Sequence, residues 1–275
     1  MDDAPFAPPD IQAAREGALV PVGRARSSAG MQYLYSYRYL FDHPNWGTTL
    51  LACSLCQLVP IVGPIVALGY QDEVIESLHR GDGAKHPAFD TSQLGYYLKR
   101  GVWPLLVALL LVLLMMPVFM VMTFGTLFGV IALAAAARDA APAVLGVAIP
   151  LAILVQFAIA LAMNMVTLPI MLRAGLSQDF GEAFRMSWTW DFIRRVWLEE
   201  LLAQLFLTIT APILVVLGLA LFCVGMYPAT AVIQMAASHL QYQLYELYLA
   251  RGGEPIPLKP PPVRVQPAII PLSPA

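Results

Sequence analysis

The chain has 275 residues, of which 59% are apolar and only 12% are charged, and its formal net charge is −2. Soluble domains hold about 45–50% apolar and about 25% charged residues, so a compact water-soluble fold has no room for this much apolar surface. The nearly neutral charge argues against nucleic acid as a partner. The composition therefore predicts an integral membrane protein whose main partner is the lipid bilayer.

Residues 1–30 are rich in Pro, Ala and Arg and show no apolar period, which predicts a disordered N-terminal arm. A helical membrane domain is expected over residues 31–250. Its beginning, residues 31–46, is dense in aromatic side chains, which prefer the membrane–water interface. Eight prolines among residues 252–275 predict an extended, unpacked and disordered tail over residues 251–275.

Five apolar runs lie within the predicted membrane domain. They cover residues 48–70, 102–137, 141–172, 201–224 and 227–250. A helix crosses the apolar part of a bilayer with about 20 such residues, so each run is long enough. Most runs contain proline, which removes a backbone hydrogen bond and kinks a helix. We expect an all-α, multi-pass bundle of four to six proline-broken membrane segments, with amphipathic helices on its cytoplasmic surface.

Two polar stretches, residues 71–101 and 177–200, are the candidates for these surface helices. In the second stretch aromatic residues recur every four positions, which places them on one face of a helix. They are Phe180, Phe184, Trp188 and Phe192. This pattern predicts either a helix lying on the membrane surface or a helix packed against the end of the bundle. The acidic pairs at residues 72–73 and 199–200 are interpreted as solvated helix ends.

The distribution of basic residues predicts the topology, because short loops rich in Lys and Arg face the cytoplasm. Residues 1–47, 71–101 and 173–200 hold four basic residues each, whereas the link at 138–140 holds only Arg138. Both termini are therefore expected on the cytoplasmic side of the inner membrane. A single span over residues 48–70 would put the N-terminus outside. A re-entrant hairpin broken at residues 59–64 keeps it inside, and this is our interpretation.

The sequence around the first apolar run resembles a known family. Residues 41–46, Phe-Asp-His-Pro-Asn-Trp, precede a run containing Leu-Val-Pro-Ile-Val-Gly-Pro at 58–64 and Leu-Gly-Tyr at 68–70, and then Gly81, Pro87 and Gly101 follow. This pattern is similar to the bacterial and archaeal membrane proteins of domain of unknown function 4013. The resemblance covers residues 38–250 in layout, although Phe89 stands where the family tends to have Trp. It implies a multi-pass membrane protein and supplies no catalytic residue.

The apolar runs lack the groups that carry chemistry in membranes. No Asp, Glu, Lys or Arg lies inside residues 102–137, 141–172 or 201–224. Proton relays and ion pathways usually need such charges. A Ser–His–Asp grouping, a Gly-rich phosphate loop and a paired-carboxylate site are also absent from the sequence. We therefore predict that the chain is not an enzyme.

Two weaker signals for a metal site receive a structural interpretation. Cys53 and Cys56 have metal-like spacing, but the sequence supplies no second pair of ligands. His239 is the one histidine near an apolar run, where packing between helices explains it. The sequence thus predicts no catalytic, cofactor-binding or metal-binding residue, and no cofactor.

These observations favour a non-enzymatic membrane scaffold or accessory subunit that packs against another membrane protein or a second copy of itself. The alternative is a transporter or channel-like protein that uses the broken segments between Pro60 and Pro64 and around Pro117. A polar cavity reaching Gln57, Gln156 or Asn164 would favour transport.

Overall fold

The computed structural model describes residues 30–81, 86–221 and 224–259, and these residues form helices and no strand. The chain divides into two units between Gly30 and Met31, and the second unit contains every helix discussed below. Its helices, in chain order, are α2 (Tyr35–Arg38), η1 (Tyr39–Asp42), α3 (Trp46–Leu58), α4 (Val62–Arg80), η2 (Thr91–Gln93), α5 (Leu94–Ala137), η3 (Arg138–Ala140), α6 (Ala141–Ser177), α7 (Phe180–Ala183), α8 (Met186–Ala220) and α9 (Met226–Ala250). The all-α prediction is confirmed for these residues.

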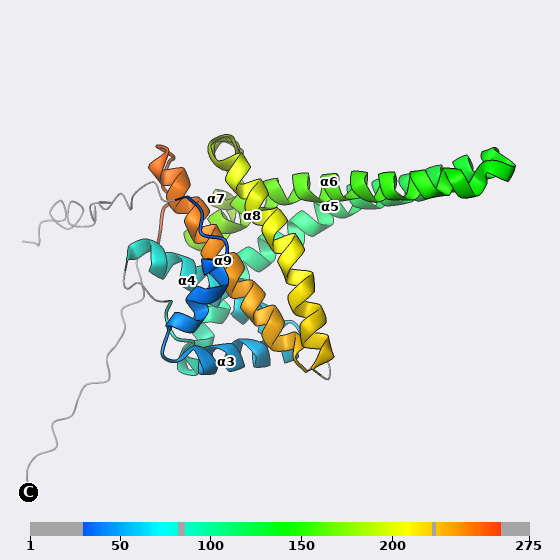
Figure 1. Cartoon of the computed structure of the whole chain (residues 1–275). Helices are drawn as coiled ribbons and strands as arrows, with labels where there is room; N and C mark the ends of the chain where they lie inside the picture. The colour runs from blue at the N-terminus through cyan, green and yellow to red at the C-terminus, as the bar shows by residue number, and fades with distance from the viewer. Residues whose placement is uncertain (1–29, 82–85, 222–223, 260–275) are drawn as a thin grey trace, which may run out of the picture. The chain divides into compact units, whose positions relative to one another are not determined.

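Helices α5 and α6 form a long hairpin that turns at η3, and they run side by side (Figure 1). The buried residues of α5 lie no further along than Leu111, and those of α6 begin only at Pro169. The structure describes all residues between these positions, and none of residues 112–168 is buried. The hairpin therefore has a base packed on the protein and a distal part, residues 112–168, in which most of the large apolar side chains are exposed.

Two stretches are long and apolar enough to cross a membrane, residues 91–177 and 186–220. The first contains both helices of the α5–α6 hairpin, and the second is mainly α8. The predicted runs at 48–70 and 227–250 lie in α3, α4 and α9, which are not among these stretches. The total of four to six membrane segments stays a prediction.

The prolines act differently in different helices. Helices α5 and α6 continue through Pro117 and Pro150, so neither residue ends its helix. In the first apolar run, α3 ends at Leu58 and α4 begins at Val62, with Ile61 between them at φ 68°. A re-entrant path through a membrane at this turn stays a prediction.

A close helix contact joins α4 to α5 at two glycines. A Cβ atom on Gly69 would lie 1.9 Å from the carbonyl oxygen of Tyr97, and one on Gly101 would lie 1.9 Å from that of Ile65. Real Cβ atoms do not approach oxygen so closely, so only glycine permits this backbone-to-backbone crossing. The crossing fixes the base of the hairpin on α4.

The predicted surface helix over residues 180–192 is two helices, because Arg185 leaves helical geometry with ψ 83° between α7 and α8. Trp188 and Phe192 are buried, with ring centroids 5.2 and 5.0 Å from that of Tyr248 in α9. The structure supports the alternative in which these aromatic residues pack against the bundle. The surface-lying alternative is wrong for Trp188 and Phe192.

Residues 251–259 form an extended segment packed on the helices, which we call the C-terminal strap. Ile256 is buried and its backbone N–H donates to the Tyr245 hydroxyl at 2.8 Å. The Trp188 indole N–H donates to the carbonyl of Glu254 at 2.8 Å, and Arg80 donates to that of Lys259 at 3.0 Å. The prediction of an unpacked tail is therefore wrong for residues 251–259. Residues 260–275 and the predicted arm at 1–29 lie outside the described residues.

The Gly101 crossing predicts a sharp difference between two glycines of the same helix. Gly101→Ala should lower the free energy of unfolding by about 3 kcal/mol, the upper part of the usual range for overpacking, because the new methyl group meets backbone. Gly129→Ala is the matched control, since nothing lies within 4 Å of its would-be Cβ and alanine favours helix. Thermal unfolding in detergent, followed by circular dichroism, checks both. Equal stability of the two variants would contradict the crossing.

Candidate functional site

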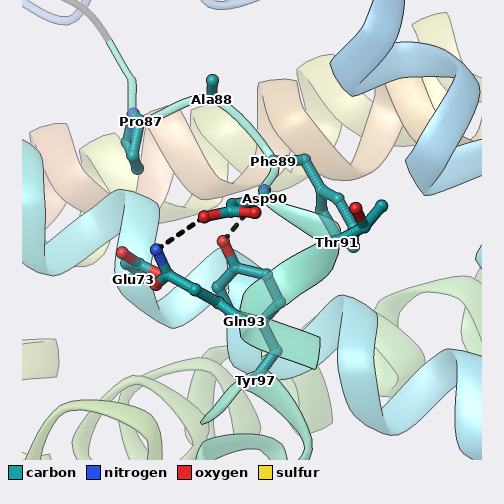
Figure 2. A pocket seen from close by; sticks show the side chains of 8 residues that line it. All are labelled: Glu73, Pro87, Ala88, Phe89, Asp90, Thr91, Gln93 and Tyr97. Atoms are coloured by element: carbon teal, nitrogen blue, oxygen red, sulfur yellow. Dashed lines mark hydrogen bonds between the residues drawn. The ribbon is translucent and has the colours of Figure 1, made fainter. Parts of the chain in front are cut away.

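A polar hollow of about 480 Å³ opens between α4 and the start of α5 (Figure 2). Its size falls within the range of small-molecule pockets. It is lined by Glu73, Pro87, Ala88, Phe89, Asp90, Thr91, Gln93 and Tyr97. The hollow lies in the first polar stretch of the sequence, next to the base of the hairpin.

Asp90 shapes the wall of this hollow by capping the turn η2. Its carboxylate accepts from the backbone N–H of Ser92 at 2.9 Å. It also accepts from the side-chain amide of Gln93 at 2.9 Å, and the Asp90 N–H donates to the Tyr97 hydroxyl at 3.2 Å (Figure 2). A helix cap of this kind satisfies backbone N–H groups that would otherwise lack partners. Asp90 is thus engaged in local structure.

A buried network of charges lies between α4, α5 and the C-terminal strap. Arg100 and Glu76 are both buried and form an ion pair, and Arg80 donates to the same Glu76 carboxylate at 2.8 Å. Arg100 also donates to the Tyr96 hydroxyl at 2.9 Å and to the backbone carbonyl of Asp72 at 3.0 Å. Buried charges are tolerated when they are paired and hydrogen-bonded in this way.

Asp72 is the least satisfied member of this region. It is buried, and its Oδ2 atom has no hydrogen-bond partner among the described residues. Its carboxyl group fills the space beside Gly175 of α6, where a Cβ would lie 2.0 Å from Oδ1. Burial raises the pKa of Asp72 to about 7; the Arg100 guanidinium opposes this rise and the Glu76 carboxylate adds to it. Asp72 therefore carries its proton at mildly acidic pH.

A second ion pair, between the buried Arg173 and the partly exposed Glu182, fixes the other side of the hairpin base. Arg173 of α6 is fully buried, forms an ion pair with Glu182 of α7 and donates from Nε to the backbone carbonyl of Glu182 at 2.7 Å. Its guanidinium also lies over the Trp188 ring, 5.0 Å from the centroid. Cation–π contacts of this kind add to an ion pair where water is excluded.

The sequence missed these charged groups. The acidic residues at 72–73 and 199–200 were expected to be solvated, yet Asp72 and Glu200 are buried, so that interpretation is wrong for both. A helical spacing of four, three and four residues places Ile65, Gly69, Asp72 and Glu76 on one face of α4. That spacing, together with a glycine in the same row, is the signal that could have revealed a packed face.

The singled-out polar residues of the apolar runs find partners within the chain. Gln57 donates to Gln234 at 2.8 Å, and Gln156 donates to Thr126 across the α5–α6 hairpin at 3.0 Å. Asn164 donates to the backbone carbonyl of Ala160, within its own helix, at 3.0 Å. Both glutamines thus form hydrogen bonds between helices.

His239 belongs to a cluster of rings and amides contributed by α2, η1 and α9. Its Nδ1 atom lies 3.0 Å from the Ser36 hydroxyl and 2.8 Å from the Gln243 amide, and its ring stacks on Tyr39 at 4.3 Å. This environment agrees with the predicted packing role. Cys53 and Cys56 are free thiols, and the described residues contain no group of three or more His, Cys, Asp or Glu that could hold a metal ion.

The raised pKa of Asp72 predicts that stability falls as pH rises. The folded protein keeps the proton up to about pH 7, whereas an unfolded aspartate releases it near pH 4, so the folded state loses stability across that interval. Asp72→Asn cannot ionise and should unfold at a higher temperature than the parent at pH 8, with a gain of up to a few kcal/mol that vanishes near pH 4.

Asp139→Asn is the control for this titration, because Asp139 is exposed at the hairpin turn. Its unfolding temperature should follow the parent at every pH. A parent protein whose stability rises between pH 5 and pH 8, with Asp72→Asn following the same curve, would contradict the assignment.

Comparison with known proteins adds a family and no activity. No curated protein and no solved structure matches the chain. The family described as "Protein of unknown function (DUF4013)" matches residues 52–223, which is more than half of the chain and confirms the resemblance seen in the sequence. The chain therefore belongs to the DUF4013 family.

Proposed function

We propose that this protein is a non-enzymatic scaffold or accessory subunit embedded in the inner membrane. The observation that carries the proposal is the apolar surface of residues 112–168, none of which is buried. Large side chains all along it are exposed, among them Leu113, Val121 and Phe128. Soluble monomers rarely expose contiguous apolar patches larger than a few hundred Å². A surface of this extent must therefore be shielded from water by lipid or by another protein.

Lipid acyl chains are the surroundings that best match the apolar surface of the hairpin. From residue 112 to the turn at η3, α5 contains no charged residue and is longer than the roughly 20 residues that a span requires. A helix also satisfies its own backbone hydrogen bonds, which the bilayer interior demands. The second half of α8 shares these properties, with Ile209, Ile213 and Val216 exposed.

The topology we propose places the η3 turn outside and both polar stretches in the cytoplasm. The turn holds one basic residue, Arg138, whereas residues 71–101 and 173–200, which include the cytoplasmic ends of α5 and α6, hold four each. Basic residues in short loops are retained on the cytoplasmic side. Both termini are then cytoplasmic as well.

The scaffold role is supported by where the polar groups are. Two ion pairs lie at the hairpin base, where Arg100–Glu76 and Arg173–Glu182 join α5 to α4 and α6 to α7. Gln57 and Gln156, which a transport path would use, donate to neighbouring helices. A rigid base that holds an apolar hairpin is suited to presenting that hairpin to a membrane-protein partner or to a second copy.

Cysteine labelling tests the membrane topology. In a background in which Cys53, Cys56 and Cys223 are replaced by alanine, Asp139→Cys should react with a membrane-impermeant maleimide on intact cells. Gln178→Cys, at the turn between α6 and α7, should react only after the membrane is permeabilised. Equal labelling of both positions before permeabilisation would contradict the proposed membrane crossing.

A flux assay separates the scaffold role from transport. Purified protein in potassium-loaded vesicles should dissipate a diffusion potential no faster than empty vesicles, because Arg100 and Arg173 at the hairpin base are each held in an ion pair. Gramicidin-treated vesicles provide the positive control. A protein-dependent ion current would overturn the scaffold role and favour the channel-like alternative.

A further inference from the structure

Helix α8 consists of two parts that meet at Val196. The backbone there is not helical, with φ −129° and ψ 17°. The part before it, from Met186, is rich in aromatic and charged residues, whereas the part after Glu200 is almost wholly apolar. The break allows the two parts to follow different directions, one along a membrane surface and one through it.

The first part of α8 has two unlike faces. One face packs into the protein through Trp188 and Phe192, which are buried. The other exposes Met186 and Trp190, each with 54% of its surface accessible, and Trp197, directly after the break, is 53% accessible. Spacings of four residues place Met186, Trp190 and Arg194 on one side of this part of the helix. This exposed side is distinct from the aromatic series that the sequence pattern pointed to.

The basic residue Arg194 lies beside the exposed Trp190. The guanidinium of Arg194 lies over the ring of Trp190, 5.3 Å from its centroid. The neighbouring Arg185 pairs with Glu254, and Arg195 pairs with Asp191. Among the described residues, no carboxylate lies within salt-bridge distance of Arg194. Its charge is therefore available to an outside anion.

The side chains on this side of the helix indicate which environment they contact. Tryptophan has an apolar ring with one polar N–H and concentrates at the boundary between lipid chains and water. An arginine there reaches towards phosphate groups, which it binds through a planar fork of donors. We propose that the side of α8 formed by Met186, Trp190 and Arg194 is a binding surface for anionic phospholipid headgroups. This inference rests on the proposed membrane function.

Fluorescence quenching by brominated lipids locates the tryptophans without changing a buried residue. The full chain is placed in vesicles of phosphatidylcholine and phosphatidylglycerol whose acyl chains carry bromine either near the headgroup or deep in the bilayer. The signal lost in Trp190→Phe, relative to the parent, is the contribution of Trp190. We expect this contribution to be quenched more by shallow than by deep bromine, and that of Trp197 to behave likewise.

The role of Arg194 is tested by placing bromine on only one of the two lipids. Brominated phosphatidylglycerol should quench Trp190 about five-fold more strongly than brominated phosphatidylcholine, as expected for one basic residue at a charged surface. Arg194→Gln should bring this ratio close to one, and Arg194→Lys, which keeps the charge, should preserve it. A ratio of one in the parent would overturn the preference for anionic lipid.

The same measurement distinguishes failure of this inference from failure of the membrane proposal. Phe128→Trp adds a tryptophan to the exposed part of the hairpin and should be quenched most by deep bromine. If it is not quenched, the membrane proposal fails. If it is quenched while Trp190 is not, or if Trp190 is quenched most by deep bromine, the headgroup surface on α8 is overturned and the membrane proposal stands.

Discussion

The close crossing of α4 and α5 at Gly69 and Gly101 is the constraint on which the hairpin base depends. Because the two backbones touch there, the side chains on either side of the crossing have fixed neighbours. Arg100, next to Gly101, is brought onto the backbone carbonyl of Asp72 and the carboxylate of Glu76. A wider separation of the helices would leave these charges buried without partners, which costs far more than the pairing itself gains.

Much of the helical architecture could be predicted because apolar runs and helix ends leave clear marks in a sequence. The turn at Arg138–Ala140 falls where the apolar runs are interrupted, and α9 begins at Met226, between the runs predicted at 201–224 and 227–250. The effect of the prolines could not be predicted, because a helix can continue through Pro117 when its neighbouring groups adapt, whereas the chain at Pro60 turns. Sequence alone does not contain those neighbours.

The periodicity of the sequence shows which residues share one face of a helix. It does not show whether that face contacts protein, lipid or water. The series Phe180, Phe184, Trp188 and Phe192 was a valid pattern, yet its last two members pack on Tyr248, and the exposed side belongs to Met186 and Trp190. In the same way, the sequence suggested that Asp72 lies at a solvated helix end. The sequence could not reveal that its carboxyl group is buried, because the group packs beside Gly175, more than one hundred residues further along the chain. Both cases depend on tertiary contacts.

The C-terminal strap has a consequence for the order in which the protein is assembled during synthesis. Arg80 and the carbonyl of Lys259 are 179 residues apart in the chain, and the strap also bonds to Trp188 and Tyr245. A ribosome delivers α4 long before it delivers the strap, so these contacts form only after the α5–α6 hairpin and both parts of α8 have emerged. In the nascent chain, contacts between helices alone must therefore hold the hairpin base together until the C-terminal strap is synthesised and packs against the helices.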